Sequence, residues 1–287
     1  MSTNGINPSS ITSANSPEIV ISANPDHSHY WRDFWSFREL LALLVWRDVL
    51  VRYKQTVIGA SWAILRPLAT MLVFTLVFGK IAKLPSSDTP YALLVFAGLL
   101  PWMFFATTLS EAGNSITANG HIVSKVYFPR LIVPVSTLLV GLVDFLLAGL
   151  VYLALAVIFG HFPNWHIIFL PLFLILLCGL IMGCGLWVAA LNVKYRDFRY
   201  IVPVVLQLGA YLSPVGFASS LVPERWRLLY SINPMVGIID GFRWSLLGDG
   251  FPLHWDSLLM SLLVTMLLLI PGIIFFRRSE GAFADAI

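Results

Sequence analysis

The sequence predicts an all-α polytopic membrane protein with six transmembrane helices, an N-terminal amphipathic interfacial helix and short re-entrant helices before the last span. Of its 287 residues, 58% are apolar and only 11% are charged, whereas a soluble domain carries about 25% charged residues. Six apolar runs are long enough to cross a bilayer, and none alternates like a strand. Backbone groups in lipid must bond within their own segment, so these spans are expected to be helical.

The first 29 residues are rich in Ser, Asn and Pro and contain no Lys or Arg. They therefore lack the basic start and the apolar stretch of a secretory signal. We expect residues 1–29 to form a disordered cytoplasmic tail.

Residues 30–60 carry an amphipathic pattern that is typical of a helix lying in the membrane interface. The apolar positions at helical spacing are Leu43, Trp46, Val49, Leu50 and Tyr53. The polar positions on the other side are Arg47, Asp48, Arg52 and Lys54. We expect the cations to face lipid headgroups and Asp48 to pair with Arg52, four residues along. Two interpretations stay open: a surface anchor alone, or a lever that also touches a cytoplasmic partner.

Residues 61–278 form the predicted transmembrane domain, followed by a cytoplasmic tail at 279–287. The expected spans are about 62–81, 92–115, 131–159, 167–191, 201–217 and 257–276. Glu111 and Asp144 are the acidic residues inside them. One carboxylate per helix is too few for a proton relay, so a functional role and a polar contact between helices are both open. Cys178 and Cys184 share one apolar run and are expected to pack without a disulfide.

Residues 119–130 form a cytoplasmic loop with a turn at its start and an aromatic pair near its end. Its candidate contact residues are Ser124, Lys125, Tyr127, Phe128 and Arg130. Exposed aromatics beside cations are typical of protein interfaces, which favours a docking knob, but a headgroup-level aromatic belt is equally open. The charged loop 192–199 is interpreted as a topology signal.

A seventh apolar stretch at 228–247 is broken by Asn233-Pro234, Asp240 and Arg243. A charge at the bilayer centre costs about 2.5–3.5 kcal/mol on insertion scales, so we expect re-entrant helices at 226–245 instead of a span. The large aromatic residues of this segment are Trp226, Tyr230, Phe242 and Trp244. They are expected either to anchor and pack the segment or to contact a glycan.

The placement of basic residues supports six spans with both termini in the cytoplasm. This topology puts 13 of the 18 Lys and Arg residues on the inner side and 5 on the outer side, as the positive-inside rule requires. A seventh span would move Arg277 and Arg278 outside.

The chain carries no HExxH, no GxSxG and no GxxxxGK[ST] motif. We therefore predict no catalytic residue, no metal site and no ATP binding through a P-loop in this chain. Transport would need an outside energy source.

Several segments together resemble the type-2 ABC exporter permeases of O-antigen, capsule and teichoic acid systems. They are Phe37-Arg38-Glu39-Leu40-Leu41, Trp46-Arg47-Asp48, residues 52–59, Trp62, Arg66-Pro67, Phe78-Gly79, residues 124–130, Val143-Asp144-Phe145, residues 192–197, Pro214 and Ser231-Ile232-Asn233-Pro234. The resemblance covers residues 30 to 278.

The resemblance implies a homodimer in the bacterial inner membrane, paired with two copies of a cytoplasmic ATPase that binds ATP and Mg. It implies a gate helix at 33–56, a coupling helix at 119–130, a periplasmic cap at 226–245, and a polysaccharide on an undecaprenyl-type carrier passing along the dimer interface. Membrane lipids are further partners, and no nucleic acid is expected. The alternatives are a permease for a drug or small lipid and a membrane-embedded enzyme acting on lipid-linked sugars.

Overall fold

The computed structural model describes residues 30–54, 61–85, 89–162 and 164–286, and the regular elements in these ranges are helices. The predicted tail at 1–29 and the segment 55–60 of the predicted gate region lie outside these ranges. The α-helices are α1 Tyr30–Ser36, α2 Arg38–Lys54, α3 Ser61–Phe74, α4 Tyr91–Ala118, α5 Gly120–Val123, α6 Ile132–Ile158, α7 Leu170–Lys194, α8 Phe198–Leu212, α9 Glu224–Tyr230, α10 Pro234–Leu247 and α11 Trp255–Ala286.

Five helical segments are long and apolar enough to cross a membrane, which confirms the predicted all-α polytopic class. They are Ser61–Ile81, Tyr91–Ala118, Ile132–Ile158, Trp165–Lys194 and Trp255–Gly281. The first of them begins as α3 and ends in π-helical turns at Thr75–Ile81, and the fourth begins with a 3₁₀ turn at Trp165–Phe169 before α7.

The fifth predicted span, 201–217, corresponds to α8, which ends earlier than expected at Leu212. Its 15 residues reach about 22 Å at 1.5 Å per residue, less than the 30 Å hydrocarbon core. The helix stops because Ser213 adopts an extended conformation before Pro214, as residues before proline do.

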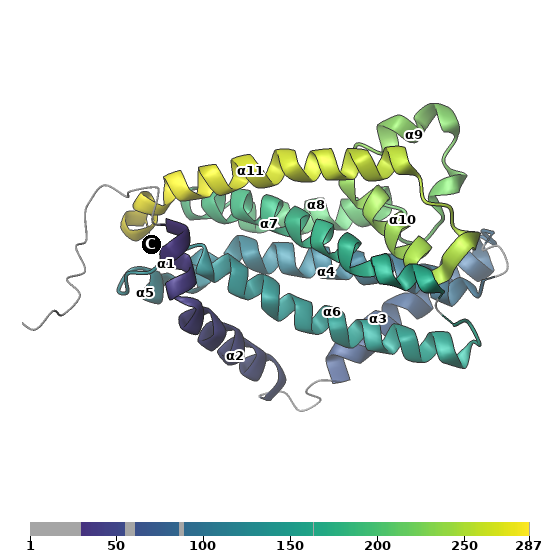
Figure 1. The fold of residues 1–287 in the computed structure, drawn as a ribbon, viewed down its shortest axis with the longest axis horizontal. Helices are drawn as coiled ribbons and strands as arrows, with labels where there is room; N and C mark the ends of the chain where they lie inside the picture. Colours follow the sequence, from purple (N-terminus) through teal and green to yellow (C-terminus); the bar gives the residue numbers. More distant parts are fainter. Residues whose placement is uncertain (1–29, 55–60, 86–88, 163, 287) are drawn as a thin grey trace, which may run out of the picture.

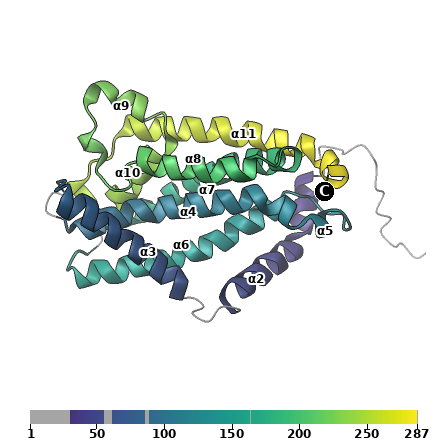
Figure 2. The ribbon, with the colours of Figure 1, turned by 180° about the vertical axis from the view of Figure 1, so that it is seen from behind.

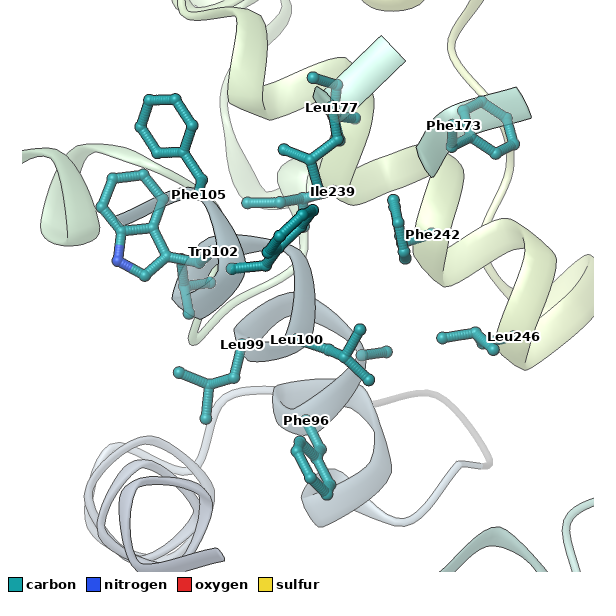
Figure 3. Close-up of a cluster of buried hydrophobic side chains, with 14 of the residues drawn as sticks. Phe96, Leu99, Leu100, Trp102, Phe105, Phe173, Leu177, Ile239, Phe242 and Leu246 are labelled. Carbon is teal, nitrogen blue, oxygen red and sulfur yellow. The ribbon is translucent and has the colours of Figure 1, made fainter. Parts of the chain in front are cut away.

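Helix α4 is the central element of the bundle and packs against α3, α6, α7, α8 and α10 (Figure 1). Its buried residues Phe96 and Leu99 share one hydrophobic core with Leu177 of α7 and with Ile239 and Phe242 of α10 (Figure 3). On the opposite side of α7, Gly183 lets α11 approach closely, since a Cβ there would lie 2.9 Å from the Leu269 backbone nitrogen. Small residues serve this purpose at membrane helix interfaces.

The segment expected to be re-entrant forms α9 and α10, which lie at the end of the bundle opposite α5 (Figures 1 and 2). Helix α10 is buried against α4, α7 and α11, while α9 has no buried residue. Arg243 of α10 is fully buried and donates to the carbonyls of Phe217 at 2.7 Å and Val215 at 3.0 Å. The guanidinium thus satisfies backbone groups just beyond α8 that have no helical partner.

The other end of the bundle gathers α1, α5 and the end of α11 (Figures 1 and 2). Tyr30 of α1 donates a hydrogen bond to Glu280 at 2.6 Å, and burial together with this carboxylate raises the pKa of Tyr30 above its ordinary value. Phe283 is buried beside Phe276. These contacts hold the end of α11, which is helical through Ala286 and so includes residues 279–286 of the expected cytoplasmic tail.

Candidate coupling and transport site

The end of α2 is tied to the bundle by a cluster of charged side chains. Arg52 donates to Glu111 of α4 at 2.6 Å and also pairs with Asp144 of α6. The hydroxyl of Tyr53 donates to the same Asp144 carboxylate. We call these four residues the latch. Both intramembrane carboxylates singled out from the sequence therefore meet at one point.

The latch lies about halfway along α6. Asp144 is 12 residues from the start of α6, or about 18 Å along the helix axis. The 27 residues of α6 span about 40 Å in all. In Figure 1, α2 runs obliquely from the α1 end toward the middle of the bundle.

This arrangement corrects one expectation for α2. Asp48 pairs with its neighbour Arg47 at 2.8 Å and not with Arg52, because Arg52 is already paired with two carboxylates. Arg47 and Arg52 both bond to residues of the bundle, and Arg47 donates to Asn119 at 3.0 Å.

Some apolar residues of α2 are exposed, and others pack against the bundle. Leu43 and Trp46 are 63% and 66% exposed, and Leu50 is also exposed. Leu44, which does not fit the predicted apolar face, is buried in the core cluster near α6 and α11. Lys54 at the end of α2 is exposed and forms no ion pair among the described residues.

The loop 119–130 presents a smaller exposed tip than expected. Ser124, Lys125 and Tyr127 are exposed, and Tyr127 is 69% accessible. Phe128 was expected to be exposed, but it is 4% exposed and packs in the cluster with Ile132 and Phe283. Because Pro129 is buried beside it, the chain turns inward before α6. The guanidinium of Arg130 lies 5.8 Å from the centre of the Phe283 ring.

A large groove with aromatic walls lies along α4, α8 and α9. Its volume is about 980 Å³, and its lining includes Trp102, Phe105, Tyr211, Trp226 and Tyr230. Trp102 and Phe105 point away from Phe242 and Leu246 in Figure 3. We call this feature the aromatic groove.

The four candidate glycan residues separate in the structure. Trp226 and Tyr230 line the aromatic groove. Phe242 is fully buried, so a surface contact with a glycan is wrong for this residue. Trp244 packs against His166, Phe169 and Phe173. Sequence reasoning did not select Trp102, Phe105 and Tyr211 as glycan candidates, because only the fold brings them to the same groove.

Within the described residues, no group of three or more His, Cys, Asp or Glu side chains is arranged to hold a metal ion. Cys178 and Cys184 are free thiols. The charged side chains gathered at the latch form ion pairs that join α2 to α4 and α6.

The fold and the site define a polytopic helical membrane protein in which ion pairs join α2 to α4 and α6. The model of the ABC-2 type transporter family matches residues 39–247, and the chain belongs to this family. It is a transport component and not an enzyme.

Three relatives cover most of the chain. It is 28% identical over 258 residues to the O-antigen export system permease protein RfbA of Myxococcus xanthus, across 89% of this chain and 98% of that protein. It is 27% identical to the O-antigen export system permease protein RfbA of Klebsiella pneumoniae, across 86% of this chain and 94% of that protein. It is 24% identical to the polysialic acid transport protein KpsM of Escherichia coli, across 82% of this chain and 92% of that protein.

Proposed function

We propose that this chain is the permease subunit of an ATP-driven ABC exporter that moves a lipid-linked polysaccharide, such as an O-antigen, across the bacterial inner membrane. The observation that carries this proposal is the similarity to an O-antigen export permease over 98% of that relative's length. The similarity to a polysialic acid transport protein extends the expected substrate class to other long cell-surface glycans.

The proposed energy source is a separate ATPase that binds ATP and Mg, with two copies serving a homodimer of this chain. Its proposed docking point is the exposed tip of the 119–130 loop, at Lys125 and Tyr127. The hydrogen bond from Arg47 to Asn119 joins α2 to the start of this loop, which supports a shared movement. The distribution of Lys and Arg supports cytoplasmic termini.

The proposed path of the glycan follows the aromatic groove, facing a second copy of the chain. Helix α8 supports this assignment because Val204, Leu208 and Tyr211 leave an apolar face exposed beside the groove. Aromatic faces stack on sugar rings, and Trp226 at 51% exposure is accessible at the α9 end. A polymer can slide along such a wall, since stacking contacts are made and released one ring at a time.

The test is transport in proteoliposomes that hold the permease, its ATPase and the lipid-linked glycan. We expect glycan to reach the opposite side of the membrane only with hydrolysable ATP and both proteins. Translocation by this chain alone, or without ATP, would overturn the proposal.

A permease for a drug or small lipid is the second candidate. It is favoured by the 24% identity to the inner membrane transport permease YadH of Escherichia coli, although that match covers only 63% of this chain. A deletion strain separates the two candidates. Polysaccharide export predicts glycan trapped inside the cell, whereas unchanged surface glycan with altered drug sensitivity supports the second candidate.

A further inference from the structure

A second cavity opens on the flank of the bundle between α2, α3, α4 and α6, apart from the aromatic groove. Its volume is about 370 Å³, within the range of pockets that hold a small ligand. Its wall combines the latch with Trp62 and Arg66 of α3 and with apolar residues of α4 and α6. We call this cavity the lateral slot.

The lining of the lateral slot changes from polar to apolar along the bundle. On α4 it runs from Glu111 and Thr107 to Leu100 and Phe96. Thr107 and Phe96 are 11 residues apart, or about 16 Å, close to half of a 30 Å hydrocarbon core. Helix α6 runs antiparallel, and its Ala148 lies on the apolar side of Asp144. This gradient suits one lipid chain whose headgroup lies at the latch.

The charges of the lateral slot occur in two separate places. At the latch, the carboxylates of Glu111 and Asp144 face the single guanidinium of Arg52, which leaves one negative charge in excess. Arg66 of α3 is exposed, lines the same slot and has no acidic partner among the described residues. The slot therefore offers one excess negative charge and one excess positive charge to a headgroup.

We propose that the lateral slot binds one zwitterionic amino phospholipid of the phosphatidylethanolamine class. Its ammonium group pairs with the carboxylates of Glu111 and Asp144, its phosphate pairs with Arg66, and an acyl chain follows Leu100 and Phe96. An anionic phospholipid or a polyprenyl diphosphate lacks the ammonium and brings additional negative charge beside two carboxylates. The inference rests on the proposed function only for the assignment of the headgroup to the cytoplasmic leaflet.

Native mass spectrometry of the delipidated full-length chain in detergent tests this proposal. The probes are phosphatidylethanolamine, phosphatidylglycerol and undecaprenyl diphosphate, each titrated separately. We expect one tightly bound phosphatidylethanolamine, held about tenfold more tightly than phosphatidylglycerol, because a charge-assisted hydrogen bond distinguishes the two headgroups.

Two variants locate the bound lipid. Arg66→Gln removes the phosphate partner, and Ala148→Trp fills the apolar part of the slot; each is expected to weaken phosphatidylethanolamine binding about tenfold or more. The matched control is Lys80→Gln, which removes an exposed cation outside the slot on the segment that continues α3. Arg66 is exposed, so its substitution leaves the packed core intact even where Ala148→Trp impairs folding.

Three results would overturn the inference: equal binding of phosphatidylglycerol, preferred binding of undecaprenyl diphosphate, or unchanged phosphatidylethanolamine binding by Arg66→Gln. The measurement needs neither ATP nor glycan. Lipid binding can therefore be confirmed even if polysaccharide transport fails, and polysaccharide transport can be confirmed even if lipid binding fails.

Discussion

Replacing Arg52 by Gln gives a direct test of whether the latch holds α2 on the bundle. The substitution leaves the carboxylates of Glu111 and Asp144 close together without their guanidinium. A charge-assisted hydrogen bond contributes about 1.5–3 kcal/mol, and there are two such pairs. The side chains of the latch are about one-third exposed, so solvent screening reduces the sum to about 2 kcal/mol.

A loss of about 2 kcal/mol raises the undocked population of α2 about 30-fold, since 1.4 kcal/mol corresponds to a factor of ten. Amide hydrogen exchange of the protein in lipid nanodiscs measures this population through opening of the docked helix. We expect the α2 amides of Arg52→Gln to exchange about 30-fold faster, while α7 is unchanged. Arg38→Gln is the matched control, because Arg38 lies on the same helix, is exposed and has no ion pair among the described residues.

Wild-type exchange rates in α2 of the Arg52→Gln protein, with an intact fold, would refute the reasoning. That result would mean that packing of Leu44 and its neighbours holds α2 without the charges. A double substitution supplies a further check. Glu111→Gln combined with Arg52→Gln removes part of the repulsion between carboxylates, so it is expected to recover part of the loss.

The other predictions concern the loop, the buried arginine and topology. Tyr127→Ala is expected to weaken co-purification of the ATPase without lowering thermal stability, whereas Phe128→Ala removes a buried ring and costs about 3–5 kcal/mol of stability; equal behaviour of the two variants would contradict this. Arg243→Gln leaves backbone carbonyls beyond α8 without a donor and is expected to lower the melting temperature, unlike Arg225→Gln on the exposed surface of α9. A reporter fused to the C-terminus is expected to be cytoplasmic, and a periplasmic signal would overturn the proposed topology.

Hydropathy was sufficient to predict the helical class and the approximate positions of the spans, because lipid leaves the backbone few alternatives. It did not predict the early end of α8 at Leu212, since Pro214 and the following residues still read as apolar sequence. The carbonyls of that region are satisfied by Arg243, 26 and 28 residues away. Such a contact has no signature in a local window.

The charge pairs show the same limit of local reasoning. Helical spacing indicated Asp48 as the partner of Arg52, but the actual partners lie 59 and 92 residues away in sequence. The predicted apolar face of α2 leaves Leu43 and Trp46 exposed, whereas Leu44, outside that face, is buried. The amphipathic pattern could not tell which face meets the bundle, because that depends on the carboxylates placed there by α4 and α6.

The latch joins three features that would otherwise respond independently: the loop 119–130, helix α2 and the lateral slot. Glu111 and Asp144 belong to the two helices that flank the loop, and Arg47 bonds Asn119 at its start. A partner that displaces the loop therefore moves both anchors of α2. Binding of the partner can shift the equilibrium between docked and undocked α2 only by the difference between its affinities for these two states. A docking free energy of about 2 kcal/mol is small enough for such a difference to overcome.

Because Arg52 and Tyr53 also form part of the slot wall, docking of α2 and binding of the lipid share the same residues. Linkage then requires that each changes the affinity of the other by the same factor. The lipid ammonium and Arg52 compete for the carboxylates of Glu111 and Asp144, so under our proposals phosphatidylethanolamine speeds exchange in α2, and Arg52→Gln strengthens lipid binding. An aminophospholipid that bound equally well to both proteins would separate the slot from the latch and confine the coupling to α2 and the loop.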